Sequence, residues 1–180
     1  DTSDAVHIQE LAFAAFAAHD LPEGMEPNLQ EQVSFDPPNF AFPFGTHVAV
    51  VEIDTETGDV GLIDYIAVDD CGVQVNPLVV EGQLHGGIVQ DVAQALHEVA
   101  AYDDNGQIIT PSLMDYLVPS AAEVPSIMLD STVTPSTSNP LGVKGVGEAG
   151  TIGSAAAGIN AVCDALSPYG ITDIAMPASP

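Results

Sequence analysis

Two runs of residues separated by a turn constrain the fold of this chain most strongly. Residues 46–54 alternate between apolar and polar types and are rich in valine, and residues 60–68 form a second run of strand-favouring residues. Successive side chains of a strand point to opposite faces, so this alternation is typical of strands that bury one face. Residues 55–58 (Thr-Glu-Thr-Gly) favour a turn. We therefore expect an antiparallel hairpin over residues 46–68.

Two glycine-bearing segments after this hairpin are predicted to be helices. Asn76 followed by Pro77 is typical of an N-cap and the first helical position, and the helix is expected to extend to about Ala100. A second, alanine-rich helix is expected over residues 150–166. The first helix contains three glycines: Gly82, Gly86 and Gly87. Since each costs about 1 kcal/mol relative to alanine, they indicate close approach of another backbone or a ligand.

The chain before the hairpin has a different character. Residues 5–18 are rich in Ala, Leu and Phe and predict a helix with Ser3 or Asp4 as its N-cap. Five prolines then fall within residues 21–44, which favours an irregular arm. We divide the chain into an N-terminal helix and proline-rich arm, residues 1–43, and a second domain, residues 44–180.

Shorter elements complete the predicted fold. Residues 104–106 (Asp-Asn-Gly) indicate a hairpin turn between residues 99–102 and 107–110. Strands are expected over residues 126–134 and 171–175. The expected fold class is α+β, with mixed β-hairpins packed against glycine-bearing helices.

The charge of the chain excludes two classes of partner. It holds 26 Asp and Glu residues against one Lys and no Arg, a formal net charge of -25. Disorder is disfavoured because 46% of the residues are hydrophobic and only 15% are charged. Nucleic acids and anionic membrane surfaces are bound through cations, so we expect neither as a partner. We favour adaptation to high salt over an ordinary acidic protein or a subunit that docks on a basic partner.

Several other features argue against particular chemistries. No apolar run approaches the roughly 18 residues of a spanning helix, no basic leader is seen, and two cysteines cannot build a disulfide framework. We therefore expect a cytoplasmic location. Cys71 follows two aspartates, which raise the pKa of its thiol and make it a poor nucleophile. The five histidines show no paired metal spacing, so no protein-ligated metal is expected.

A glycine-rich stretch at residues 142–153 is the most informative motif. It contains a literal GxGxxG, but this follows a loop rather than a buried strand, which disfavours a dinucleotide-binding fold. Glycines still let backbone amides approach an anion or a cofactor. The only cation, Lys144, lies in this stretch. Glu148 stands where a carboxylate either compensates the helix dipole or acts as a base at a cofactor edge.

A second candidate group lies on the helix predicted from Asn76. Gln83 and Gln90 are seven residues apart and so share a helical face, with Gly86 and Gly87 between them. Their amides could bind a polar cofactor at a surface thinned by glycine. A tight helix crossing with solvated glutamines is the alternative.

Several ordered motifs together resemble the C-terminal part of the molybdenum-binding large subunit of the xanthine dehydrogenase family. The nearest branch is that of aldehyde and carbon monoxide dehydrogenase-like large subunits. The matching stretches are FGTHVAVVE at 44–52, VDDCG at 68–72, NP at 76–77, VEGQLHGG at 80–87, SLMDY at 112–116 and NPLGVKGVGEAG at 139–150. Asp91 departs from the pattern, since family members commonly have Gly there.

The resemblance implies roles for individual residues. Glu148 matches the family's catalytic glutamate, a general base that faces the molybdenum, and Gln83 matches a glutamine that hydrogen-bonds at the molybdopterin. The loop would lie along the cofactor. The full set of implied cofactor-binding residues is Gln83, Gly86, Gly87, Lys144, Gly145, Val146 and Gly147.

The resemblance also implies a function, cofactors and partners. The chain would be the cofactor-binding and catalytic-base segment of a molybdenum hydroxylase that oxidises an aldehyde, a purine-like heterocycle or CO. Molybdenum-molybdopterin, in the cytosine dinucleotide form, would be its cofactor. The remainder of the large subunit, an iron–sulfur subunit and an FAD subunit would be its partners. A fragment, a split subunit and a relic are all compatible with its length. A non-catalytic structural or assembly subunit and a phosphate- or nucleotide-binding module are the alternatives.

Overall fold

The computed structural model describes residues 5–180. The chain divides into two compact units between Asp36 and Pro37. The first unit contains helix α1 (Ile8–Ala17), which has His7 at its N-cap and ends at Ala18 in a left-handed conformation. The predicted caps Ser3 and Asp4 lie outside the described residues. The helix exposes most of its large apolar side chains, and only Ala15 is buried. The predicted division at residue 43 stays a prediction.

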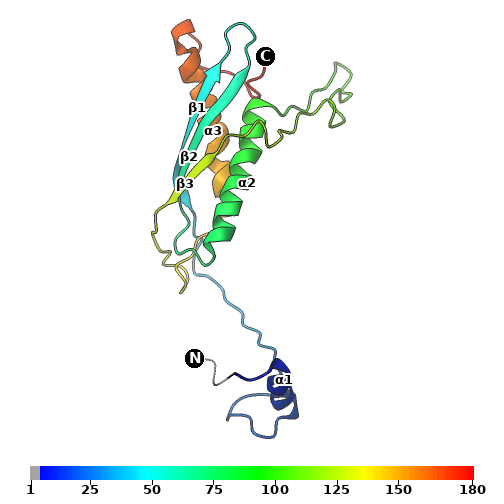
Figure 1. Cartoon of the computed structure of the whole chain (residues 1–180), viewed down its shortest axis with the longest axis vertical. Helices are drawn as coiled ribbons and strands as arrows, with labels where there is room; N and C mark the ends of the chain where they lie inside the picture. Colours follow the sequence, from blue (N-terminus) through cyan, green and yellow to red (C-terminus); the bar gives the residue numbers. More distant parts are fainter. Residues whose placement is uncertain (1–4) are drawn as a thin grey trace. The chain divides into compact units, whose positions relative to one another are not determined.

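The predicted hairpin is confirmed and forms most of a three-stranded sheet in the second unit (Figure 1). Strands β1 (Phe44–Ile53) and β2 (Val60–Asp70) pair antiparallel, with Phe44 opposite Asp70. Strand β3 (Ile127–Ser131) pairs parallel to β2 and is shorter than the predicted strand at 126–134. The sheet order β1-β2-β3 and the helices give the predicted α+β class.

Two helices pack on the sheet face that carries Tyr65 and Ala67. Helix α2 (Pro77–Leu96) and helix α3 (Ala149–Leu166) join these residues in the main core, together with Ile88 and Val162. The Asn76 cap is confirmed, because its side chain accepts a hydrogen bond from the Val79 amide. A short 3-10 helix (Ser167–Tyr169) follows α3.

Helix α2 ends before the predicted Ala100. The amides of His97 and Glu98 both bond the carbonyl of Ala93, which closes the last turn. The Ala95 carbonyl accepts a hydrogen bond of 2.7 Å from the amide of Ala178, so the C-terminal segment occupies this end of the helix. A long-range contact of this kind leaves no local signal in the sequence.

The two other predicted elements differ from the structure. The turn predicted at residues 104–106 is present, but the segments beside it pair only through one isolated bridge, between Tyr102 and Ile108. Asp103 accepts amide hydrogen bonds within this turn. The strand predicted at residues 171–175 is wrong: Ile174 packs against the core, but its segment pairs with no strand.

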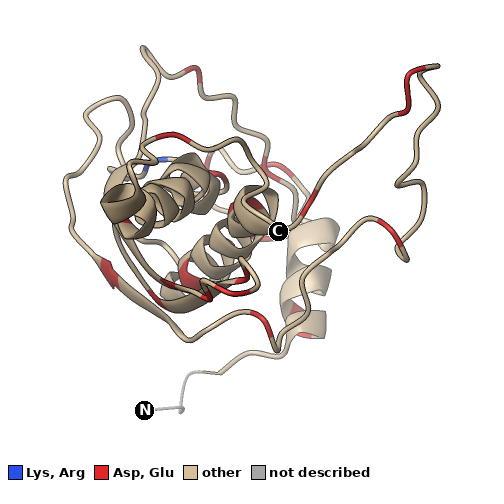
Figure 2. Ribbon diagram, turned by 90° about the horizontal axis from the view of Figure 1, so that it is seen from above, with Lys and Arg blue, Asp and Glu red and all other residues tan. Residues whose placement is uncertain are grey.

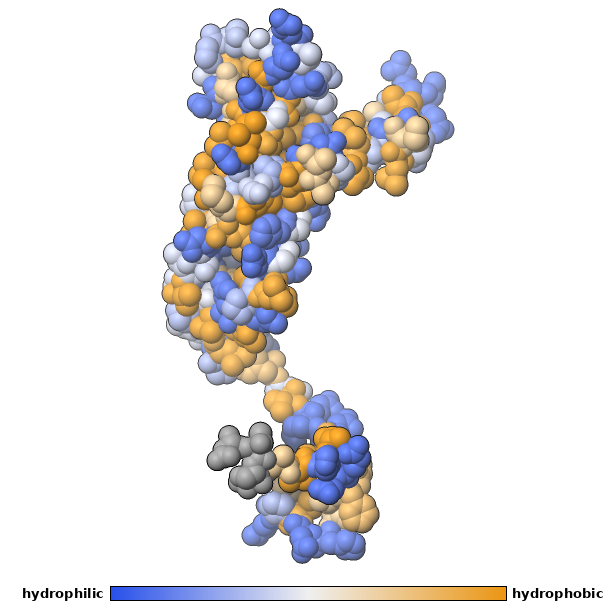
Figure 3. Space-filling model, viewed as in Figure 1, coloured by the Kyte–Doolittle hydropathy of each residue, from blue (hydrophilic) through white to orange (hydrophobic). Residues whose placement is uncertain are grey.

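Exposed apolar residues mark the extension between α2 and β3, where hydrophobic and hydrophilic colours mix in Figure 3. Leu113 is 83% exposed and Met114 is 92% exposed. Within residues 5–180, no helix combines the length and the apolar character that crossing a membrane requires.

Candidate functional site

The loop that precedes α3, residues 142–148, is fixed against the end of β2, and we call it the glycine loop. Gly72 and Val143 form an antiparallel bridge, and the Lys144 amide donates to the Cys71 carbonyl over 2.8 Å. Gly72 has a φ of +69°, and a Cβ there would collide with the carbonyl oxygen of Gly142. The two chains can therefore cross so closely only because residue 72 is glycine.

Lys144 is committed to a buried carboxylate. Its Nζ lies 3.0 Å from Oδ1 of Asp70, and the two side chains are 9% and 0% exposed. The same ammonium lies 4.6 Å from the centre of the Phe44 ring. Lys144 provides the only blue segment in Figure 2, among acidic groups that are distributed over both units. The cofactor-binding role predicted for Lys144 stays a prediction: its ammonium is paired with Asp70, and its amide already donates to the Cys71 carbonyl.

The environment of this pair shifts two pKa values. Burial alone would raise the pKa of Asp70, but the Gly72 amide, the Lys144 ammonium and Thr134 outweigh it and hold this pKa well below its ordinary value. The pKa of the Cys71 thiol is raised, as the sequence predicted. Burial is the larger cause, and the neighbouring carboxylates add to it.

Glu148 occupies the N-cap position of α3 with an exposed side chain. Its carboxylate makes no capping hydrogen bond, so the simple capping interpretation does not apply. Its carbonyl accepts from the amides of Thr151 and Ile152, which begins the helix at a defined point. The carboxylate is therefore placed at the positive end of α3 and stays accessible.

Gln83 lies beside the glycine loop, as the predicted grouping requires. Its Nε2 atom is 3.5 Å from the place where a Cβ on Gly147 would be. The side-chain amide of Gln83, on α2, thus borders Gly147, the residue that precedes Glu148, although Gln83 and Gly147 are more than sixty positions apart. Gln83, Gly145 and Gly147 are all exposed, and nothing lies within 4 Å of a Cβ built on Gly145.

The glycines of α2 divide into two kinds. Gly86 is exposed, and a Cβ there would meet nothing within 4 Å. Gly87 is buried, with its Cβ position 3.1 Å from the Cα of Gly150. The sequence left a helix crossing and a ligand as alternatives, and at Gly87 the neighbour is α3. Contact of either glycine with a cofactor stays a prediction.

The glycine loop presents unpaired backbone donors. Within residues 5–180, the amides of four successive residues form no hydrogen bond to a backbone carbonyl: Gly145, Val146, Gly147 and Glu148. Val146 packs partly buried against a small core cluster that includes Cys71 and Leu84, which holds the loop in place. Ordered amides next to a helix N-terminus are suited to bind anionic or strongly polar groups.

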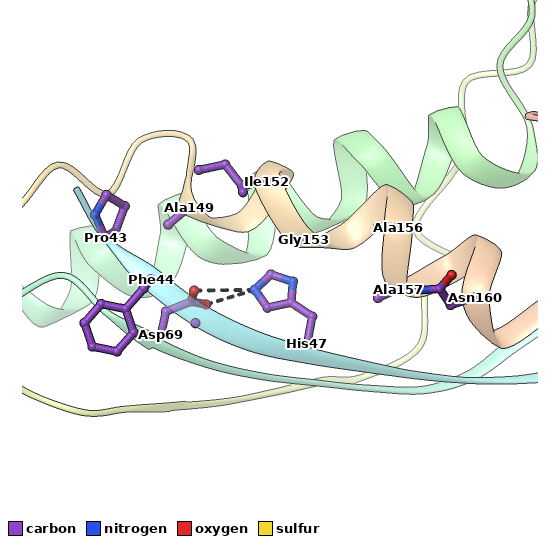
Figure 4. A pocket seen from close by; sticks show the side chains of 11 residues that line it. Pro43, Phe44, His47, Asp69, Ala149, Ile152, Gly153, Ala156, Ala157 and Asn160 are labelled. Carbon is purple, nitrogen blue, oxygen red and sulfur yellow. Dashed lines mark hydrogen bonds and ion pairs between the residues drawn. The ribbon is translucent and has the colours of Figure 1, made fainter.

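A cavity of about 220 Å³ between β1 and α3 holds residues that the sequence analysis did not single out (Figure 4). The imidazole of His47 places Nε2 3.2 Å from Oδ2 of Asp69 and Nδ1 2.8 Å from the hydroxyl of Tyr65. A Cβ at Gly153 would lie 3.0 Å from the His47 ring, and one at Gly45 would collide with Asp69. The only local signal of this network in the sequence was the pair Asp69 and Asp70 at the end of the apolar strand β2.

The hydroxyl of Tyr65 completes this network. Its pKa is raised, mainly by burial and further by Asp69 and Asp91, so it remains a neutral phenol that is hydrogen-bonded to His47. The pKa of Asp69 is raised by burial, and His47 partly offsets that rise. A hydrogen-bond chain of this kind stabilises the fold only while each member keeps its partner.

We expect Tyr65→Phe to lower the free energy of unfolding by about 1–2 kcal/mol, because it leaves His47 Nδ1 without its hydrogen-bond partner in a buried site. Tyr102→Phe is the control, since Tyr102 is 61% exposed and donates to no buried group. Urea unfolding of both variants measures the difference. Equal stability of the two variants would contradict the network.

The relatives match nearly the whole chain, and the family model matches about two thirds of it. The family model of the molybdopterin cofactor-binding domain matches residues 2–125. The carbon monoxide dehydrogenase large chain of Hydrogenophaga pseudoflava is 40% identical over 177 residues, which cover 98% of this chain and 22% of the relative. The nicotine 6-hydroxylase large subunit of Paenarthrobacter nicotinovorans is 40% identical over 176 residues, with 97% and 22% covered.

A solved structure shares the fold. The crystal structure of a Cu,Mo-CO dehydrogenase in its carbon monoxide reduced state superposes with a TM-score of 0.84 and 38% identity. The match covers 97% of this chain and 22% of that chain. The chain thus spans about a fifth of the length of the relatives that it matches.

Proposed function

The chain belongs to the family of molybdopterin cofactor-binding domains, and on this premise we propose that it holds the cofactor of a molybdenum hydroxylase along its glycine loop. Gln83 and residues 144–147 would contact the cofactor, and Glu148 would act as the catalytic base. The single observation that carries this proposal is the position of Gln83 beside Gly147, one residue before Glu148.

The residues present fit such a group. Four amides of the glycine loop have no backbone acceptor, two exposed glycines leave the loop open, and the Gln83 amide borders it. A pterin with its phosphate presents acceptors and donors along one edge, which backbone amides and a carboxamide can match. The exposed Gly86 extends the same open surface on α2.

Glu148 is suited to accept a proton. When bound, the cofactor supplies the two-electron oxidation of a substrate carbon, with water as the source of oxygen. A carboxylate oxygen of Glu148 would take the proton of the attacking water, which is general-base catalysis. Glu148 is exposed at the N-terminus of α3, which leaves both of its carboxylate oxygens available.

The relatives support a wider assembly. Two of them are named as the large chain or large subunit of a carbon monoxide dehydrogenase and of a nicotine 6-hydroxylase. We propose that the remainder of a large subunit, an iron–sulfur subunit and an FAD subunit complete the enzyme, in the cytoplasm. We also propose the cytosine dinucleotide form of the cofactor. The substrate would be an aldehyde, a purine-like heterocycle or CO.

Cofactor retention in the assembled complex tests this proposal. We expect Gln83→Ala to weaken retention roughly tenfold, since it removes about one hydrogen bond worth 1–1.5 kcal/mol. Gln94→Ala is the matched control, an exposed glutamine of the same helix. Molybdenum and pterin are measured per complex after dialysis. A wild-type complex without molybdenum would favour a non-catalytic structural subunit.

A further inference from the structure

The Asp70 carboxylate connects three parts of the second unit that are distant in sequence. It is completely buried at the end of β2 and accepts hydrogen bonds of 3.0 Å from the Gly72 amide, the Thr132 hydroxyl and the Lys144 ammonium. Thr132 follows β3, and Lys144 lies in the glycine loop. One side chain therefore binds the β2 end, the β3 end and the loop together.

The pair fixes one end of the segment that carries Glu148. At Lys144 the loop is held by its side chain on Asp70 and by its amide on Cys71. At the other end, the backbone of Gly150 lies against Leu84 and Gly87 of α2. Between these two attachments, only five residues remain, and Glu148 is one of them. The backbone from which its carboxylate extends is therefore held by both attachments.

Resting on the function proposed above, we infer that the buried Asp70–Lys144 pair positions the Glu148 carboxylate by fixing the glycine loop. The side chain of Lys144 is a positioning group rather than an anion ligand. The only cation among 180 residues serves this internal contact, and it leaves anion binding to the loop amides. Neutralising one member of a buried ion pair leaves the other as an unpaired buried charge. We therefore expect the loop to be equally sensitive to substitution of Asp70 and of Lys144.

The test uses the assembled complex and five variants. Asp70→Asn and Lys144→Met each remove one member, and the double variant Asp70→Asn/Lys144→Met removes both without leaving an unpaired charge. Asp64→Asn is the matched control, because Asp64 is an exposed aspartate on the same strand. Measured quantities are kcat and KM against pH, molybdenum content, and hydrogen exchange of the amides of residues 143–151.

We expect the double variant to fold and to lose kcat by on the order of 100-fold, because a small displacement of a catalytic group costs about that much. KM changes little, the acid limb of the pH profile shifts, and the loop amides exchange faster. Lys144→Arg should keep part of the kcat that Lys144→Met loses, since arginine keeps a cation at Asp70. A merely structural role would lower the amount of active complex without moving the pH profile.

Two results overturn the inference. The first is a double variant that keeps the wild-type kcat and pH profile. The second is a double variant whose loop amides exchange at the same rate as those of the wild type and of the Asp64→Asn control. Failure of the proposed function gives a different pattern, in which Glu148→Gln stays active or the wild-type complex lacks molybdenum. The two failures can therefore be told apart in one set of preparations.

Discussion

Glu148→Gln in the assembled complex should lower kcat by about 100- to 10,000-fold and leave the molybdenum content near that of the wild type. The carboxylate makes no capping hydrogen bond and is exposed, so the change to an amide removes a base without removing a structural contact. The amide keeps the size and shape of the side chain, which preserves the start of α3. Steady-state kinetics and elemental analysis on the same sample measure both quantities.

Glu56→Gln provides the control for this prediction, because Glu56 is an exposed carboxylate in the turn between β1 and β2. It should leave both kcat and metal content unchanged. A Glu148→Gln complex with full activity would remove the base from the proposed mechanism. Loss of molybdenum together with loss of activity would instead make Glu148 a residue for cofactor retention.

The sequence motifs identified the correct family, and the local patterns predicted most of the secondary structure. The hairpin followed from alternation, and the start of α2 followed from Asn76 and Pro77, because both signals act between residues close in sequence. The strand expected at residues 171–175 was wrong, since a short apolar run cannot reveal whether a neighbouring strand is available to pair with it.

The arrangement around the glycine loop required contacts that no local pattern encodes. Lys144 and Asp70 are 74 positions apart, and His47 and Asp69 are 22 apart. The sequence suggested that Lys144 serves an anionic cofactor because it is the only cation in the chain. The structure shows that it is bound to a buried carboxylate. Charge count alone cannot distinguish a ligand for a cofactor from half of an internal ion pair.

The helix crossing at Gly150 gives the second large expected effect, which concerns stability. A Cβ at Gly150 would lie 2.5 Å from the carbonyl oxygen of Leu84 and 2.9 Å from the amide nitrogen of Ile88. Both atoms belong to the α2 backbone, so no side-chain rotation can relieve the contact. The helices must separate, which loosens a core that also holds Ile88 and Val162.

We expect Gly150→Ala to lower the free energy of unfolding by about 2 kcal/mol, since overpacking of up to about 3 kcal/mol exceeds the roughly 1 kcal/mol that alanine gains in a helix. Gly82→Ala is the matched control and should raise stability by about 0.5–1 kcal/mol, because nothing lies within 4 Å of its Cβ. Urea unfolding measures both, and a Gly150→Ala variant as stable as Gly82→Ala would refute the close crossing.

The same comparison separates the glycines of the GxGxxG motif by their physical roles. Gly145 and Gly147 lie open beside the expected cofactor, whereas Gly150 serves the contact of two helices. Alanine at Gly145 should therefore act on cofactor retention and leave stability unchanged, and alanine at Gly150 should act on stability first. A motif that resembles a single binding signature thus combines the exposed surface proposed for the cofactor with a structural crossing that holds it in place.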